Sequence, residues 1–309
     1  MEKNIVIATR GSGLAIKQSE IVKALLISQF PGIKVSFLEV VTHGDVDRET
    51  PLSAFGNTGV FVKSLEEKLL SGEADLAVHS LKDVPSVSHP DLQLAAFPVR
   101  EDVRDVLVTR DGGNWRSLKT GVVVGTSSPA RTEQMKLLRP DLIFSPIRGN
   151  VETRVKKVLD GEYYATILAA AGLNRLGYKT GKSAYFTLDE MIPSPGQGAL
   201  AIQVNRNRTE IVELVGTLNN PAIELLVKAE RAFMAVIGGG CRFPVAACAQ
   251  YEGKSITFRG MAYKPGFKNI ETVKFETTEN GLFEKAVQEA KKIILKNETN
   301  MFAEKHKYQ

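Results

Sequence analysis

Cysteine, histidine and tryptophan are all scarce in this chain of 309 residues. It has one tryptophan, two cysteines (Cys241 and Cys248) and four histidines that lack metal-ligand spacing, namely His43, His79, His89 and His306. Two cysteines cannot form a disulfide framework or a four-ligand zinc site. The sequence therefore predicts no structural metal and no disulfide scaffold.

Long hydrophobic runs are also missing. Runs such as GVVVG at 121–125 are far shorter than the roughly 20 apolar residues that cross a bilayer. The N-terminus, MEKNIVIATRG, has an apolar run of only four residues, which is too short for a secretory signal. We therefore expect a cytoplasmic protein with reduced thiols and no membrane partner.

Charge of one sign is nowhere concentrated. The formal net charge is +5, and the chain has no block of lysine and arginine of the kind that binds nucleic acid. A mild basic excess suits a small polyanionic ligand instead. The share of hydrophobic residues, 43%, is normal for a soluble protein, and the length suits two or three domains.

The first two thirds of the sequence alternate between strand and helix patterns. Apolar runs typical of strands occupy 4–9, 35–42, 74–80, 105–110, 121–127, 142–149 and 164–172. Amphipathic helix patterns lie between them at 14–30, 59–72, 128–140 and 150–161. This alternation predicts two α/β units with mostly parallel sheets, joined near 97–105. The segment 193–198 looks like a second crossing, which would return a strand at 199–205 to the first sheet and leave a cleft between two lobes.

The last part of the chain has a different pattern. One helix is expected at 222–237 and another at 281–296, with antiparallel strands at 255–263 and 271–278. This order predicts a small α+β domain. The expected domain boundaries are 1–97 plus 198–216 for domain 1, 102–193 for domain 2 and 217–309 for domain 3.

Two strand-to-helix junctions stand out as candidate anion sites. TRGSG at 9–13 precedes the first helix, and GTSSPAR at 125–131, in which Ser128 is a suitable N-cap, precedes a helix of the second lobe. Hydroxyls and unpaired backbone N–H groups at a helix start can bind an anion, although ordinary capping explains either junction alone. One such junction in each lobe, each with an arginine (Arg10 and Arg131), favours an anion held between the lobes.

Further arginines lie at comparable places in the second lobe. Arg148 follows a strand, Arg154 lies on the first turns of a helix that Asn150 could cap, and Arg175 ends a short helix. Arginine binds carboxylates through two parallel hydrogen bonds. Solvated surface charge is the alternative, but positions near the carboxyl ends of strands favour binding.

The segment HSLKDVP at 79–85 follows a strand and ends in a proline turn. At this edge Asp83 could stabilise positive charge that develops on a substrate, while Lys82 could bind an acidic group. The alternative is a turn with a neighbouring ion pair.

The two cysteines differ in their surroundings. Cys248 lies in the strand-like VAACAQ and fits a buried, inert side chain. Cys241 follows three glycines, which give backbone freedom and exposure, and Arg242 beside it could favour a thiolate. We expect Cys241 to be a nucleophile or a cofactor anchor.

These stretches together resemble the porphobilinogen deaminase family, also called hydroxymethylbilane synthase. They follow the family's order from about residue 7 to 250 and read ATRGSGLAIKQ, FVKSLEEKLLSGEADLAVHSLKDVP, VGTSS, IRGNVETR, ILAAAGLNRLG, SPGQGALAIQ and AERAF…GGGCRFPVAA. HSLKDVP and RGNVETR together are highly specific for this family.

The resemblance implies a fold, a cofactor and a set of site residues. The fold is α/β with three domains: the first two resemble a two-lobed periplasmic binding protein (type II) around a cleft, and the third is a small α+β domain with an antiparallel sheet. The cofactor is a dipyrromethane held by a thioether on Cys241, and the catalytic residue is Asp83. The implied cofactor and substrate contacts are Arg10, Ser12, Gln18, Lys82, Thr126, Ser127, Ser128, Arg131, Arg148, Asn150, Arg154 and Arg175.

The resemblance also implies a reaction, that of a transferase in porphyrin and haem biosynthesis. Arginines and helix N-termini would hold the carboxylate arms of porphobilinogen, and Asp83 would stabilise the cation that forms as ammonia leaves. Four rounds of condensation build a linear tetrapyrrole, which water releases as hydroxymethylbilane. Hinge motion is expected at 97–102 and 193–198, in a monomer that needs no nucleic acid.

The sequence departs from the family's usual pattern at three positions. Ala130 stands where a second arginine is usual, Thr58 replaces a lysine, and Arg242 follows the cysteine. We expect Ala130 to remove one cationic contact with the cofactor or the growing chain. The alternatives are a two-lobed binding protein for a small polycarboxylate, or a family member that lost activity. The expected lack of a signal segment and the presence of Cys241 argue against the first, and retention of Asp83 and Cys241 argues against the second.

Overall fold

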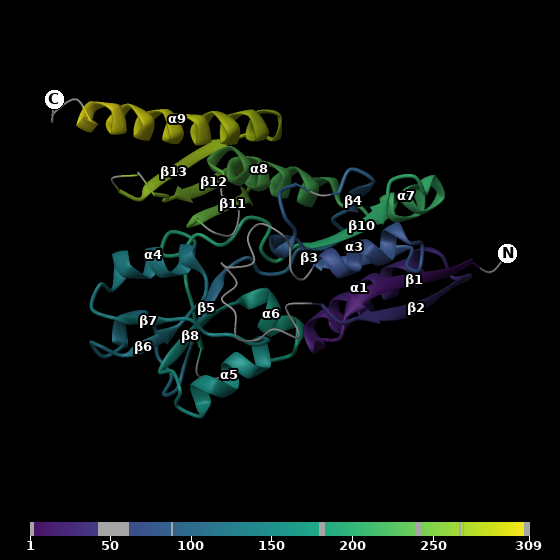
Figure 1. The fold of residues 1–309 in the computed structure, drawn as a ribbon, viewed down its shortest axis with the longest axis horizontal. Coiled ribbons are helices and arrows are strands. Elements are labelled where there is room, and N and C mark those ends of the chain that lie inside the picture. The colour runs from purple at the N-terminus through teal and green to yellow at the C-terminus, as the bar shows by residue number, and fades with distance from the viewer. Residues whose placement is uncertain are drawn as a thin grey trace.

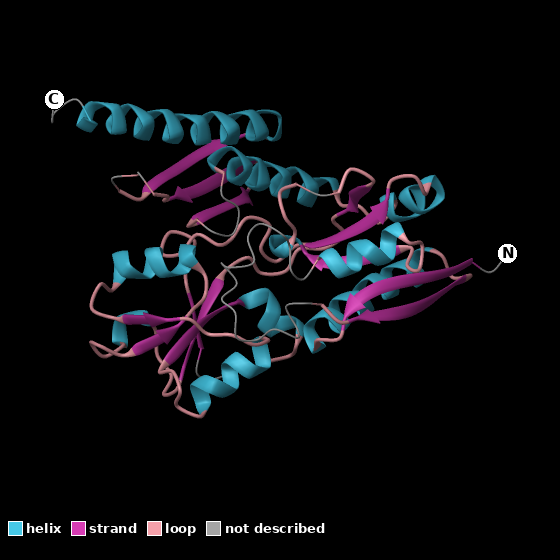
Figure 2. Ribbon diagram, viewed as in Figure 1, coloured by secondary structure: helices cyan, strands magenta, loops and turns pink. Residues whose placement is uncertain are grey.

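The computed structural model describes residues 3–42, 62–87, 89–178, 183–238, 243–265, 267 and 269–305. These residues form three separate β-sheets with flanking helices (Figure 1). Figure 2 shows the strands of the three sheets as distinct groups, with helices packed on each. Two of the sheets have five strands and the third has three.

The first sheet has the strand order β2-β1-β3-β10-β4. Its strands are β1 (Lys3–Arg10), β2 (Ile33–Val40), β3 (Leu76–Ser80), β4 (Leu92–Ala96) and β10 (Leu200–Asn205). β1 pairs in parallel with β2 and β3, whereas β10 runs antiparallel to both β3 and β4. The return of β10 to this sheet confirms that the chain crosses twice between the lobes.

The second sheet repeats this arrangement with the order β7-β6-β8-β5-β9. Its strands are β5 (Asp105–Thr109), β6 (Val123–Gly125), β7 (Ile143–Ser145), β8 (Ala165–Ala169) and β9 (Ser183–Tyr185). β6 is parallel to β7 and β8, whereas β5 is antiparallel to β8 and β9.

The expectation of mostly parallel sheets therefore holds for four strands in each sheet and fails for one. The reversed strands are β5 and β10, and each is the first strand after a crossing between the lobes. A chain that arrives from the other lobe enters at the end of the sheet where the crossings lie, which is the carboxyl end of the neighbouring strands, so it runs against them. The two-lobed α/β fold with a third, antiparallel-sheet domain is confirmed.

Alternating side chains bury both faces of each five-stranded sheet. The first carries α1 (Gly13–Gln29) and α7 (Thr209–Gly216) on the face of Ile5 and Ile7, and α3 (Lys63–Leu70) on the face of Ala8. In the second, Val106 and Val108 of β5 face one way and Leu107 the other. The valines meet α5 (Val151–Leu159) and α6 (Ala170–Arg175), and the leucine faces α4 (Pro129–Leu138).

The third sheet is antiparallel, with the order β11-β12-β13 (Val245–Glu252, Ser255–Ala262 and Glu271–Thr277). It packs against α8 (Pro221–Ile237) and α9 (Glu279–Lys305), which lie side by side in Figure 1. The ring centroid of Phe233 on α8 lies 5.5 Å from that of Phe258, with the two rings tilted by 55°. A Cβ on Gly260 would stand 2.9 Å from Phe233, so glycine allows this close approach.

Four elements differ from the sequence expectations. The sequence did not predict β4, α7 or β9, and α9 is longer than the helix expected at 281–296. β9 has only three residues, too few for a periodic pattern to stand out. Among the described residues, no helix is both long and apolar enough to cross a membrane.

The two crossings lie side by side and hydrogen-bond to each other. Arg100 of the first forms a β-bridge with Ala199 of the second, and the Glu101 N–H donates to the Gly198 carbonyl at 3.0 Å. Gly198 has φ of 83°, and a Cβ there would lie 2.3 Å from the Glu101 carbonyl oxygen. Only glycine fits this position, because both the backbone conformation and the close contact exclude a side chain.

A buried ion pair fastens the third domain to both crossings. The Arg100 guanidinium donates to both oxygens of Glu230 on α8, at 2.9 and 3.0 Å. The same carboxylate accepts the N–H of Gly196 from the second crossing and that of Ala249 from β11. Glu230 is fully buried, and four hydrogen bonds compensate its desolvation.

Candidate active site

Lys82 and Asp83 lie at the carboxyl end of β3, as the sequence predicted. The strand runs directly into a single 3-10 turn, η2 (Leu81–Asp83). Leu81 is fully buried, and its N–H donates to the Ala199 carbonyl of the second crossing at 3.0 Å. This anchor turns Lys82 to a half-buried position and leaves Asp83 exposed, so the carboxylate is accessible to a ligand.

Lys82 faces charged groups from both lobes. Burial, helped by the nearby Arg131 guanidinium and by Arg154, lowers its pKa to about 8, while Asp83 and Asp105 act in the opposite direction. Its Nζ donates to the neutral Oε1 of Gln197 at 3.1 Å. Lys82 forms no ion pair within the described part of the chain, so its charge is available to an anionic ligand.

Arg154 is the second such cation. It lies on α5 of the second lobe, where Asn150 caps the helix by accepting the Thr153 N–H at 2.9 Å. Burial, together with Arg131 and Arg148, lowers the pKa of Arg154 to about 10. Its Nε donates to the Gly149 carbonyl, and no described carboxylate pairs with it. We name Lys82, Asp83 and Arg154 the cleft cluster.

Arg131, which the resemblance implies as a cofactor contact, is paired within the protein. Its Nε and one terminal nitrogen donate to the two oxygens of Asp105 at 3.1 and 2.7 Å, and the other terminal nitrogen donates to the Ile167 carbonyl. The side chain is buried, so most of its donors are used within the protein. We name Arg100, Asp105, Arg131, Gln197 and Glu230 the hinge cluster.

The hydroxyls of the second-lobe junction mainly organise the chain. Ser128 caps α4 by accepting the Arg131 N–H, and Thr126 accepts the Ser128 N–H. The Ser127 hydroxyl donates to the Ile147 carbonyl at 2.8 Å, which ties the end of β6 to the segment after β7. The capping alternative therefore describes these hydroxyls in this structure.

The first-lobe junction is also capped. Ser12 accepts the Ala15 N–H at the start of α1, and Arg10 is the last residue of β1. Gln18 is buried, and its Nε2 donates to the Ser80 hydroxyl at 2.7 Å, just before Lys82. Gln18 thereby ties α1 to the strand that presents the cleft cluster.

Arg175 lies apart from the cleft cluster, beside the crossings. Its terminal nitrogen donates to the Gly198 carbonyl at 2.7 Å. Burial lowers its pKa to about 10, against the opposing effect of Glu101. In this structure Arg175 therefore supports the second crossing.

Ala130 lies on α4 against the third domain. Its side chain is 7% exposed and packs against Ala246 and Met261 of the third domain. An arginine here would have to leave or rearrange this apolar contact, and the expectation that Ala130 removes a cationic contact with the cofactor stays a prediction.

Cys241 and Arg242 lie outside the described residues, as does Thr58. The neighbouring cysteine is described: Cys248 is 1% exposed in β11, and burial raises the pKa of its thiol to about 12. This confirms the expectation of an inert core thiol. The sequence did not predict a role for Gln197, Asp105 or Glu230, which are polar residues within apolar or glycine-rich stretches.

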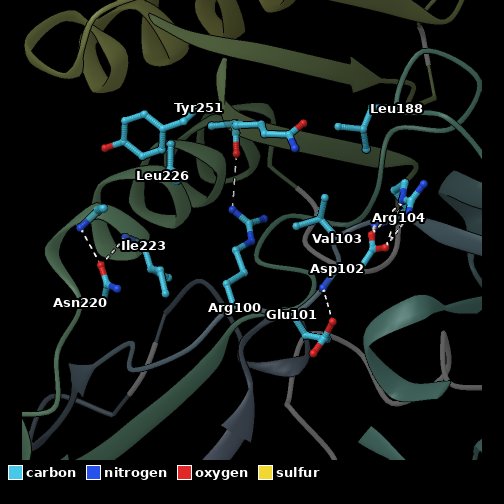
Figure 3. A pocket seen from close by; sticks show the side chains of 13 residues that line it. Arg100, Glu101, Asp102, Val103, Arg104, Leu188, Asn220, Ile223, Leu226 and Tyr251 are labelled. Atoms are coloured by element: carbon cyan, nitrogen blue, oxygen red, sulfur yellow. Dashed lines mark hydrogen bonds and ion pairs between the residues drawn. The ribbon is translucent and has the colours of Figure 1, made fainter. Parts of the chain in front are cut away.

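A cavity of about 660 Å³ lies beside the first crossing (Figure 3). Arg100 projects into it towards Tyr251 and Leu226, with Glu101 and Asp102 on the other side. None of the residues predicted for the active site lines it. The described residues also contain no group of three or more potential metal ligands.

The arrangement can bind polycarboxylates and stabilise a nearby positive charge. Lys82 and Arg154 come from opposite lobes, and neither forms an ion pair with a described carboxylate. Both lie near the exposed carboxylate of Asp83. Cations in a desolvated cleft attract anionic groups, and a carboxylate beside them can favour charge that develops on the same ligand.

Comparison with known proteins agrees with this chemistry. The porphobilinogen deaminase dipyrromethane cofactor-binding domain matches residues 5–213, and the porphobilinogen deaminase C-terminal domain matches 224–301. A porphobilinogen deaminase of Roseiflexus sp. is 44% identical over 84% of this chain and 86% of its own length. That of Campylobacter concisus is 40% identical over 97% of this chain and 99% of its own.

Similarity to solved structures is much lower. The periplasmic VFT2 domain of Bordetella pertussis BvgS shares 18% identity, with a TM-score of 0.42 over 70% of this chain and 87% of that chain. The family assignment comes from the sequence matches, which cover most of the chain at 40–47% identity. This chain belongs to the porphobilinogen deaminase family.

Proposed function

We propose that this chain is a hydroxymethylbilane synthase. It condenses four porphobilinogen molecules head to tail on a covalently held dipyrromethane, releases ammonia at each step, and hydrolyses the product to hydroxymethylbilane. The observation that carries the proposal is the cleft cluster, in which exposed Asp83 lies near Lys82 and Arg154, two cations that form no ion pair with a carboxylate in the described chain. Porphobilinogen brings the carboxylates that these cations lack.

Asp83 is the proposed catalytic residue. As ammonia leaves the aminomethyl group, positive charge develops on the pyrrole system. A carboxylate held at the end of a buried strand can stabilise that charge without reorganising. Its anchor, Leu81, is hydrogen-bonded to the second crossing, so Asp83 has a defined position even though its side chain is exposed.

The cations of both lobes are proposed to hold carboxylate arms. Lys82 and Arg154 combine lowered pKa values with the absence of ion pairs among described residues, and anion binding would favour their charged forms. Arg131 and Arg175 would act mainly by holding the cleft, since their donors are used by Asp105 and Gly198. The other proposed contacts are Arg10, Ser12, Gln18, Thr126, Ser127, Ser128, Arg148 and Asn150.

The residues present fit a dipyrromethane. The matched family model is a dipyrromethane cofactor-binding domain, and the cations of the cleft cluster suit the carboxylates of such a group. We propose that Cys241 holds it by a thioether. When bound, the dipyrromethane supplies the pyrrole α-carbon to which the substrate is joined.

The proposal includes domain boundaries and hinges. The domains are 1–97 plus 198–216, 102–193 and 217–309, with hinges at 97–102 and 193–198. The paired crossings and the cavity of about 660 Å³ beside the first support bending there. We further propose that the protein acts as a cytoplasmic monomer.

Ammonia release tests the function directly. Purified protein incubated with porphobilinogen should release four ammonia molecules for each hydroxymethylbilane formed. A binding protein for polycarboxylates would bind porphobilinogen without releasing ammonia. Binding without turnover, in protein that carries the dipyrromethane, would contradict the proposal.

A further inference from the structure

Gln197 occupies the centre of the contacts between the crossings and the cleft. It lies on the second crossing and is fully buried. Its Nε2 donates to the Val103 carbonyl at 2.8 Å and to Asp105 at 2.7 Å. Its Oε1 accepts from Lys82 at 3.1 Å and lies 3.5 Å from a terminal nitrogen of Arg131. One amide thus links Lys82 of the first lobe to Val103, Asp105 and Arg131 of the second.

The orientation of this amide is fixed by its partners. The Val103 carbonyl and the Asp105 carboxylate can only accept hydrogen bonds, so the NH₂ group must face them. The oxygen then faces Lys82 and Arg131, which can only donate. A reversed amide would place its oxygen against a carboxylate and its NH₂ against two cations. The second lobe therefore directs an acceptor at Lys82.

We propose that Gln197 is a positioning residue that holds the Lys82 ammonium in the cleft and ties its place to the Asp105–Arg131 pair. The inference rests on the proposed function, since it gives Lys82 its role as a carboxylate-binding group. Lys82 has a long flexible side chain, and this single acceptor is its hydrogen-bond partner among the described residues. Because Gln197 lies on a proposed hinge, it keeps Lys82 in place close to the point about which the lobes move.

The charged groups around Lys82 also affect its protonation. Arg131 and Arg154 face it from the second lobe and disfavour the ammonium, while Asp83 and Asp105 favour it. Burial also disfavours the ammonium and is the largest of these effects, so the pKa of Lys82 is lowered to about 8. An acceptor bonded to a charged donor favours the charged form, so removing the Gln197 oxygen should lower the pKa of Lys82 further.

The first lobe contains a matched control. Gln203 on β10 is also fully buried and also uses its amide for two side-chain hydrogen bonds. Its Oε1 lies 2.9 Å from His79 Nε2, and its Nε2 donates to Glu66 at 2.8 Å. It contacts no member of the cleft cluster. Replacing it therefore measures how much stability is lost with a buried glutamine, without any effect on Lys82.

The experiment compares Gln197→Leu with Gln203→Leu in the form that carries the cofactor. We measure cofactor content by intact mass, the melting temperature, and kcat and KM for porphobilinogen from neutral to alkaline pH. Both variants should lose stability. Only Gln197→Leu should raise KM, by about tenfold, as expected for a lost hydrogen bond to a charged group. Only Gln197→Leu should also move the alkaline decline of kcat/KM to lower pH.

The outcomes separate the inference from the proposed function. Equal KM values and equal pH profiles in the two variants, with an active wild type, would overturn the inference alone. A wild type that carries the dipyrromethane but releases no ammonia would overturn the function instead. If Gln197→Leu does not fold, Gln197→Asn keeps the amide but is one methylene too short to reach both sides. Wild-type KM and pH profile in that variant would also overturn the role of Gln197.

Discussion

The hinge cluster and the cleft cluster contain similar residues in opposite states. In the hinge cluster each arginine has its own carboxylate: Arg100 pairs with Glu230, and Arg131 pairs with Asp105. In the cleft cluster Lys82 and Arg154 bond only to neutral oxygens within the described chain. Paired buried charges hold domains together, whereas cations without carboxylates remain available to a ligand. Pairing therefore distinguishes the structural cations from the binding ones.

Removing the catalytic carboxylate should give the largest effect on activity. Asp83→Asn keeps the shape of the side chain and removes its negative charge. We expect kcat to fall by about 10²–10³-fold, as for other groups that stabilise charge in a transition state. The melting temperature should stay close to that of the wild type, because Asp83 is exposed. Near-wild-type turnover would show that another group stabilises the cation.

Breaking the hinge pair should instead lower stability. Glu230→Gln leaves Arg100 buried opposite a neutral amide, at a cost of about 3 kcal/mol in the free energy of unfolding. Glu224→Gln on the same helix is the control, because its pair with Lys228 is partly exposed and worth about 0.5 kcal/mol. Denaturant unfolding measures the free energy of unfolding of both variants. Equal decreases would contradict the claim that the buried pair contributes more to stability than the exposed one.

Loss of a cleft cation should weaken binding without unfolding the protein. Arg154→Ala should raise KM for porphobilinogen about tenfold, because a charge-assisted contact with a carboxylate is lost. Arg116→Ala is the matched control in the same lobe, since Arg116 is exposed and pairs with Glu190. An unchanged KM for Arg154→Ala would place that arginine outside the binding site.

The pH dependence of binding should show the smallest effect. The pKa of Lys82 is lowered from 10.5 to about 8, mainly by burial, so its ammonium is lost as the pH rises through about 8. KM should therefore rise severalfold above that pH, and Lys82→Arg should flatten the rise. Between about 8 and 10.5 the unfolded chain binds more protons at this residue than the native one, so this group's contribution to stability increases with pH. A flat KM in the wild type would contradict the role of Lys82.

Much of this molecule follows from local patterns in the sequence. Strand and helix periodicity located both lobes and both crossings, and the position of HSLKDVP after a buried strand located Lys82 and Asp83. The reversal of β5 and β10 was not predictable from local patterns, because strand direction depends on how the chain returns between lobes.

The pairing of charged side chains was equally unpredictable from the sequence. Nothing in GTSSPAR indicates that Arg131 meets Asp105, which lies 26 residues earlier in the chain. Nor does the sequence indicate that α4 turns Ala130 towards the third domain. Gln197 gave no signal beyond its place in a glycine-rich crossing. These features depend on contacts between distant segments, which local propensity does not determine.

The most direct test of the central claim is the intact mass of protein purified from a host that makes porphobilinogen. The account predicts that the wild type carries two linked pyrrole units and that Cys241→Ser carries none. When the wild type is mixed with substrate, further species should appear. Each should be heavier than the one before by the mass of one porphobilinogen minus that of one ammonia. A wild type of unmodified mass that gains nothing from porphobilinogen would contradict the account.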